Sequence, residues 1–217
     1  MIITQYLGAI IGVYIVLTII FFFSAYNIDI WRSIFFVLFV CFIGFSLYGL
    51  AQFACKKINN VYEVCMAVIF PVLLILLLMM TCLYLLPAWV RVFSNTFGYI
   101  FDKDRPQIIQ GILGTIGTGI QLEAIKRLYA EPSPFIDELD ISDYVKDHAG
   151  NYVSWQSFTN IINIVRPNTQ PTNNQIQALH AMLKQREQIG NCVWYILIGT
   201  ITIFVSTNTL FSNGCGG

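Results

Sequence analysis

The stretch Val64–Val90, "VCMAVIFPVLLILLLMMTCLYLLPAWV", contains no charged residue over its whole length. The same is true of three other stretches, Met1–Ile28, Ser33–Cys55 and Gln188–Gly217. Each is long enough to cross a hydrocarbon core of about 30 Å, which takes roughly 20 helical residues. A charged side chain at the centre of such a helix costs about 2.5–3.5 kcal/mol, so its absence from all four stretches is informative. The sequence therefore predicts an all-α, polytopic membrane protein with four transmembrane helices.

The composition of the whole chain agrees with this prediction. Of its 217 residues, 56% are hydrophobic and 11% are charged, whereas soluble domains are about 25% charged. The predicted membrane helices cover residues 2–26, 33–55, 64–86 and about 190–211. Residues 1–90 thus hold three of them, and residues 189–217 hold the fourth and a short C-terminal tail. Pro71 lies inside the third helix and lacks a backbone donor, which predicts a kink.

Residues 91–188 differ from the rest of the chain. They contain nine of the twelve Lys and Arg residues and ten of the twelve Asp and Glu residues. Their hydrophobic spacing predicts an extramembrane domain built from helices. The first of these helices is expected to begin after Asp104, its N-cap. The second covers residues 134–147, and the third begins after Ser154, its N-cap. The last begins after Thr172 and continues into the fourth membrane helix as one long helix, because only Gly190 interrupts the pattern.

The segment "GILGTIGTGI" at 111–120 is the most glycine-rich part of this domain. It lacks the Lys of a phosphate-binding P-loop, and it has neither the spacing nor the preceding strand of a dinucleotide-binding loop. Gly111, Thr115 and Gly119 instead recur every four residues and form one smooth stripe on a helix. Such a stripe lets another helix approach closely. We therefore interpret these three residues as a partner contact and not as a nucleotide site.

Gly8 and Gly12 form a G-x-x-x-G pattern in the first predicted membrane helix. This pattern is typical of a helix-packing face, although glycine is also common in membrane helices by chance. Both interpretations remain open at this stage.

The remaining polar residues do not form a recognisable catalytic or metal-binding motif. Five acidic residues cluster at 137–147, but their spacing does not fit a calcium-binding loop, and we interpret them as a solvated acidic face. His148 and His180 lie apart and outside any zinc-binding pattern. The sequence therefore predicts no enzyme activity, no metal and no cofactor.

Most of the basic residues near the helix ends lie on the same side of the membrane as residues 91–188. The positive-inside rule therefore predicts that residues 91–188 face the cytoplasm. The six cysteines all lie in or beside the predicted membrane helices, so this domain has no disulfide of its own, as expected in a reducing compartment. The layout, with a large loop between the third and fourth helices, resembles that of the tetraspanins. The Cys-Cys-Gly motif of that family is missing from the loop, so the resemblance extends only to the layout.

These observations predict a non-enzymatic, integral membrane protein that anchors or organises a larger assembly. Its expected partners are membrane lipid and other protein subunits, and no nucleic acid. Two settings fit equally well: an accessory subunit of an organelle membrane complex, and a membrane component beneath a viral capsid. The alternative function is a channel or transporter subunit, in which the kink at Pro71 would act as a gate.

Overall fold

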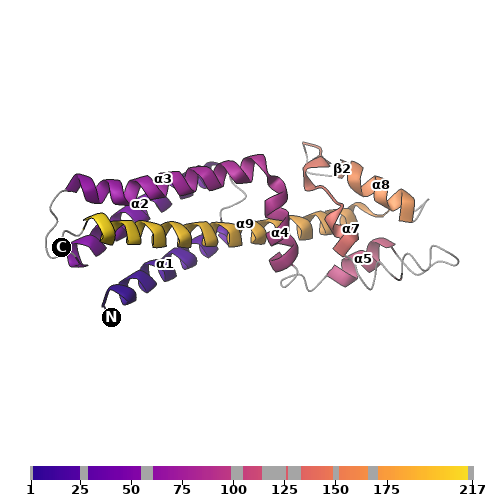
Figure 1. Ribbon diagram of the computed structural model, residues 1–217. Helices are drawn as coiled ribbons and strands as arrows, with labels where there is room; N and C mark the ends of the chain where they lie inside the picture. The colour runs from indigo at the N-terminus through magenta and orange to yellow at the C-terminus, as the bar shows by residue number, and fades with distance from the viewer. Residues whose placement is uncertain are drawn as a thin grey trace. The chain divides into compact units, whose positions relative to one another are not determined.

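The computed structural model describes residues 2–24, 29–54, 61–98, 105–113, 126, 133–148, 152–165 and 171–214. Of these residues, 90% are helical, which confirms the prediction of a mostly helical protein. The chain divides into two compact units (Figure 1). Unit 1 comprises Met1–Arg91 and Asn191–Gly217, and unit 2 comprises Val92–Gly190. Each unit is described separately below.

Unit 1 contains three long apolar helices and the C-terminal part of a fourth. They are α1 (Ile2–Ser24), α2 (Asp29–Ala54), α3 (Val61–Leu85) and α9 (Asn173–Thr209), which ends in the short π-helix η3 (Leu210–Gly214). Within the unit, α2 packs against both α1 and α3, and η3 packs against α3. The buried face of α1 presents Tyr14, Thr18 and Phe22, which recur every four residues. This spacing places them on one side of the helix.

Two helices are long and apolar enough to cross a membrane, judged on the residues that the structure describes. These spans lie within Gln5–Ser24 and Asn173–Ser212. The apolar stretches in the other two long helices, Val37–Phe53 and Cys65–Ile75, are shorter. Two of the four predicted membrane helices therefore have the length and composition of spans in the structure.

α3 runs through Pro71 as one helix, and the Pro71 ring is buried. The helix is interrupted at Leu86 instead, and α4 (Pro87–Phe97) begins directly after it. Proline suits the first position of a helix, because its missing N–H would have no partner there. The kink predicted at Pro71 stays a prediction, whereas the break at Pro87 is observed.

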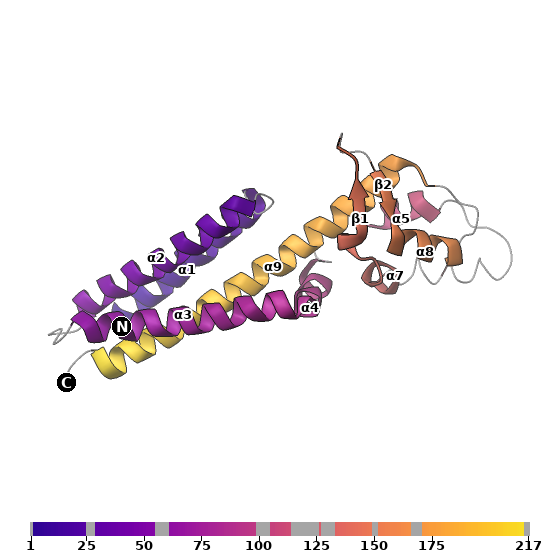
Figure 2. The same ribbon diagram turned by 90° about the horizontal axis from the view of Figure 1, so that it is seen from above.

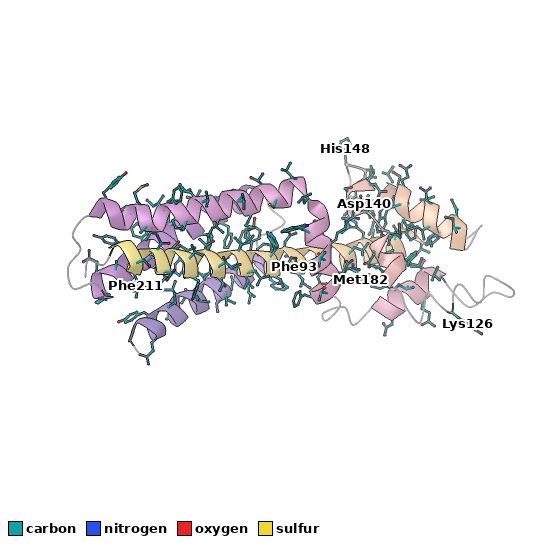
Figure 3. All side chains as sticks on the ribbon, viewed as in Figure 1. Phe93, Lys126, Asp140, His148, Met182 and Phe211 are labelled. Atoms are coloured by element: carbon teal, nitrogen blue, oxygen red, sulfur yellow. The ribbon has the colours of Figure 1, made fainter. Side chains whose placement is uncertain are left out.

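Unit 2 is a small domain built around one apolar core. Its described elements are α5 (Arg105–Leu113), α7 (Ser133–Asp137), the 3-10 helix η2 (Ile141–Asp143), β1 (Tyr144–Lys146), β2 (Tyr152–Trp155), α8 (Gln156–Val165), and the parts of α4 and α9 that fall within Val92–Gly190. The core contains Trp155, Phe158, Leu179 and Met182 together with Ile109, Ile112 and Leu113 of α5. Met182 is labelled in Figure 3 on the part of α9 that belongs to this unit.

The hairpin of β1 and β2 corrects two sequence predictions. Residues 134–147 were predicted to form one helix, but α7 ends at Asp137 and the chain continues as η2 and β1. Ser154 was predicted to cap a helix, but it pairs with Val145 in the antiparallel hairpin. β-branched and aromatic residues fit the pleated surface of a strand. They supply five of the seven strand residues here: Tyr144, Val145, Tyr152, Val153 and Trp155. Figure 2 shows the two strands side by side.

The prediction for the start of α9 is confirmed by its capping contacts. The Thr172 hydroxyl accepts a hydrogen bond from the Gln175 backbone N–H at 3.4 Å, and the Gln175 side-chain oxygen accepts one from the Thr172 N–H at 2.8 Å. This reciprocal pair is a capping box, which satisfies two backbone donors at the helix start. α9 then continues without a break through Gly190 to Thr209. The single long helix predicted from the sequence is therefore present.

Candidate functional site

The strongest polar constellation in unit 2 is centred on Arg186 of α9. The side chain of Arg186 is buried, with only 6% of it exposed, and its guanidinium forms an ion pair with Asp137 at the end of α7 at 2.6 Å. The same guanidinium donates a hydrogen bond to the side-chain oxygen of Asn95 in α4. A buried charge is tolerated only when it is paired and hydrogen-bonded. These contacts therefore tie α4, α7 and α9 together within unit 2.

Two glycines let α4 and α9 approach closely within unit 2. A Cβ atom at Gly98 would overlap the side chain of Arg186, and a Cβ atom at Gly190 would overlap Ser94, including its backbone nitrogen and Cα. The stem of Arg186 therefore lies across Gly98, and the backbones of the two helices meet at Gly190. Small residues permit such close approach between helices.

We expect Gly190→Ala to destabilise unit 2 by about 1–2 kcal/mol. Overpacking costs roughly 1–3 kcal/mol, and the higher helix propensity of Ala returns up to about 1 kcal/mol. Urea unfolding of the detergent-solubilised chain measures the change. Gly111→Ala is the matched control, because a Cβ atom there would meet only the side-chain nitrogen of Gln175, at an ordinary 3.6 Å. Equal unfolding midpoints for the two variants would contradict the close contact at Gly190.

A second cluster joins the hairpin to α9 through aromatic contacts. The ring of His180 stacks on Tyr144 with centroids 3.7 Å apart, and it meets Trp155 edge-on at 5.9 Å. Tyr144 also packs edge-on against Trp155 at 5.3 Å, and Lys146 Nζ lies 5.5 Å from the centroid of the Tyr144 ring. Burial, together with the positive charges of Lys146 and Lys184, lowers the pKa of His180 to about 4. His180 is therefore neutral in this cluster at neutral pH.

This depressed pKa predicts that unit 2 loses stability as the pH falls. The ordinary pKa of His is about 6.5, so the unfolded chain binds more protons than the folded chain between pH 6.5 and about 4. The stability that neutral His180 contributes to the folded state is fully present above pH 6.5 and is lost progressively as the pH falls to about 4. Urea unfolding across this range should show the loss in the wild-type chain and a smaller loss in His180→Phe. His148→Gln, which changes the other histidine, is the control and should behave as the wild type; identical pH profiles for all three chains would contradict the assignment to His180.

Three acidic residues that the sequence suggested as a solvated face have structural contacts instead. Asp137 pairs with Arg186, Asp140 accepts a hydrogen bond from the N–H of Ser142 at 2.9 Å, and Asp143 accepts one from the N–H of Ser157 at 2.7 Å. The contact of Asp143 caps the start of α8, the role that the sequence had assigned to Ser154. Trp155 adds a hydrogen bond from its indole N–H to the carbonyl oxygen of Asp140 at 2.7 Å. Among the described residues, no group of three His, Cys, Asp or Glu side chains has the arrangement of a metal site.

The glycines singled out from the sequence lie at different kinds of positions. Gly8 and Gly12 are exposed on α1, and no atom of the described chain would lie within 4 Å of a Cβ at either residue. Gly111 lies on α5, where its carbonyl oxygen accepts a hydrogen bond from Gln175 of α9 at 2.7 Å. Thr115 and Gly119 lie outside the described residues. The role of these five residues in partner contact stays a prediction.

A different glycine forms the close helix contact in unit 1. A Cβ atom at Gly199 of α9 would overlap the ring of Tyr14 on α1. The Tyr14 hydroxyl donates a hydrogen bond to the carbonyl oxygen of Tyr195 at 2.5 Å. Thr202 and Ser206 are also buried on α9, three and seven residues after Gly199. This spacing of small residues on one helix face was the signal in the sequence that could have identified the contact.

Two hollows in the described surface of unit 1 are apolar. A groove of about 750 Å³ runs along α3 and is lined mainly by Phe70 and leucines, and a cavity of about 300 Å³ lies between α1 and α2. The side chains that line them carry no charge and offer mainly hydrocarbon surface. The few polar groups that would orient a polar ligand in a binding pocket are therefore scarce in these two linings.

No protein-family model, curated protein or solved structure matches this chain.

Proposed function

We propose that the chain is a non-enzymatic, multi-pass membrane protein that anchors a larger membrane-associated assembly through unit 2. The observation that carries this proposal is the exposure of α1. Its apolar window, Gln5–Ser24, is only 17% buried within the chain. Exposed apolar surface of this extent is unusual in a soluble monomer and requires lipid or another apolar surface to cover it.

The lengths of α2 and α3 support the proposal that all four long helices span the bilayer. They contain 26 and 25 residues, which correspond to about 39 and 37 Å at 1.5 Å per residue. Both lengths exceed a hydrocarbon core of about 30 Å. Exposed Phe45, Phe53, Phe70 and Leu74 on these helices would then contact acyl chains.

The continuity of α9 supports the role of unit 2 as the anchored part. Residues up to Gly190 belong to unit 2 and contribute Ile176, Leu179, Met182 and Leu183 to its core. Residues from Asn191 belong to unit 1 and carry the apolar span. α9 is thus one helix whose first part belongs to unit 2 and whose second part belongs to unit 1. We propose the cytoplasmic-like side for unit 2, in the membrane of an organelle or beneath a viral capsid, and other subunits as its protein partners.

Extraction from native membranes in a mild detergent tests this function. An assembly subunit is expected to co-purify with partners in fixed stoichiometry and to give no conductance in planar bilayers. Gly111→Leu and Gly119→Leu should weaken this association while the chain stays in the membrane. A chain that purifies alone and conducts ions, with conductance altered by Pro71→Ala, would contradict the proposal and support the channel alternative.

A further inference from the structure

The helix α4 presents an apolar face that the described residues leave uncovered. Leu86, Trp89, Val92 and Phe97 are all exposed, and Val92 is 62% exposed. Leu86 (which precedes Pro87), Trp89 and Val92 follow one another at intervals of three residues, and Phe97 lies eight residues after Trp89. At 3.6 residues per turn, all four fall within an arc of about 140° around the helix. The opposite side carries Ser94 and Gly98, which are buried within unit 2. α4 is therefore amphipathic, with one face packed in the protein and one apolar face that is exposed as far as the described residues go.

The position of α4 in the chain identifies what can cover this face. It follows directly after α3, whose exposed residues Leu74, Leu78 and Leu85 would lie against lipid if α3 spans the membrane. The helix break at Leu86 means that α4 does not simply prolong α3. Trp89 stands at the transition from the apolar to the polar part of the sequence, and Trp is enriched where a membrane meets water. Trp89 packs edge-on against Trp194 at 5.5 Å within unit 1.

We propose that α4 is an interfacial helix that inserts Trp89, Val92 and Phe97 into the headgroup region of the bilayer. This inference rests on the proposed function, because it requires α3 to span the membrane. Helices of this type bury their apolar face about 5–10 Å into the boundary between headgroups and acyl chains. The partner is a lipid surface, not a protein.

A spin label at position 92 of the full chain in lipid vesicles tests the proposal. The six native cysteines are replaced by Ala, and single cysteines are introduced as Val92→Cys, Leu74→Cys and Ile164→Cys. Leu74 is the deep reference on α3, and Ile164 of α8, which is 81% exposed, is the water reference. Collisions with dissolved oxygen report hydrocarbon, and collisions with a water-soluble nickel chelate report water. We expect the ratio of oxygen to nickel collisions at position 92 to lie between those of the two references.

Each other outcome overturns the inference. A ratio at position 92 equal to that at position 164 would place α4 in water. A label that collides with neither reagent would show that protein covers this face. The reference at position 74 separates the two proposals. A low, water-like ratio of oxygen to nickel collisions at position 74 would contradict the membrane span of α3. A high ratio at position 74 with a water-like ratio at position 92 would contradict only the interfacial helix. Labels at exposed positions leave the packed faces of the helices unchanged.

Discussion

Asp137→Ala is expected to destabilise unit 2 by about 3 kcal/mol. The substitution removes the carboxylate that lies 2.6 Å from the guanidinium of Arg186. Severing a buried ion pair typically costs about 3–5 kcal/mol, because the remaining charge stays buried. We expect the lower end of this range, since the Asp137 side chain is 36% exposed and only the Arg186 side chain is deeply buried. Urea unfolding of the chain in detergent, and hydrogen exchange of α9 peptides before Gly190, would both report the loss.

Two further variants make this prediction specific. Glu138→Ala removes the same charge from the neighbouring exposed residue and should change the free energy of unfolding by less than about 0.5 kcal/mol. Asp137→Ala combined with Arg186→Met should be more stable than Asp137→Ala alone, because the uncompensated charge is then absent. A double variant as unstable as the single one would show that packing by Arg186, and not its charge, dominates.

Gly199→Leu is expected to displace α1 from α9 in unit 1 and to cost about 2–4 kcal/mol. The new side chain would occupy the space of the Tyr14 ring. Overpacking costs roughly 1–3 kcal/mol, and loss of the hydrogen bond from Tyr14 to the Tyr195 carbonyl adds about 1 kcal/mol. Thermal unfolding in micelles should show a lower midpoint, and α1 peptides should exchange faster.

Gly12→Leu is the matched control for this prediction. A Cβ at Gly12 meets no atom of the described chain within 4 Å, so the thermal midpoint should stay unchanged. If Gly8 and Gly12 pack against another protein, as their spacing predicts, Gly12→Leu would weaken that association without affecting unfolding. A fall in midpoint as large as that of Gly199→Leu would instead contradict the arrangement of α1 in unit 1.

The sequence predicted the long helices well because their signals are local. Uncharged stretches identify α1, α2 and α3. The start of α9 is identified by Thr172 and Gln175, whose capping hydrogen bonds form within one helical turn. The hairpin was missed because its strands contain three and four residues. So short a pattern cannot be separated from a helix segment by periodicity alone.

The polar contacts of unit 2 could not be predicted because they join distant parts of the chain. Asp137 and Arg186 are 49 residues apart in sequence, and no spacing rule connects them. The glycine contacts show a related limit. G-x-x-x-G at Gly8 and Gly12 fits a packing face, but the sequence does not say which face of a helix meets a neighbour in the same chain. In the structure, Gly98, Gly190 and Gly199 make these contacts instead.

Labelling from one side of sealed vesicles tests the central claim most directly. In a chain whose native cysteines are replaced, Asn59→Cys lies between the second and third proposed spans, and Asn163→Cys lies on α8 of unit 2. A membrane-impermeant maleimide should label these two positions from opposite sides if four helices cross the bilayer. Labelling of both from the same side would leave only α1 and α9 as spans and would contradict the four-span account.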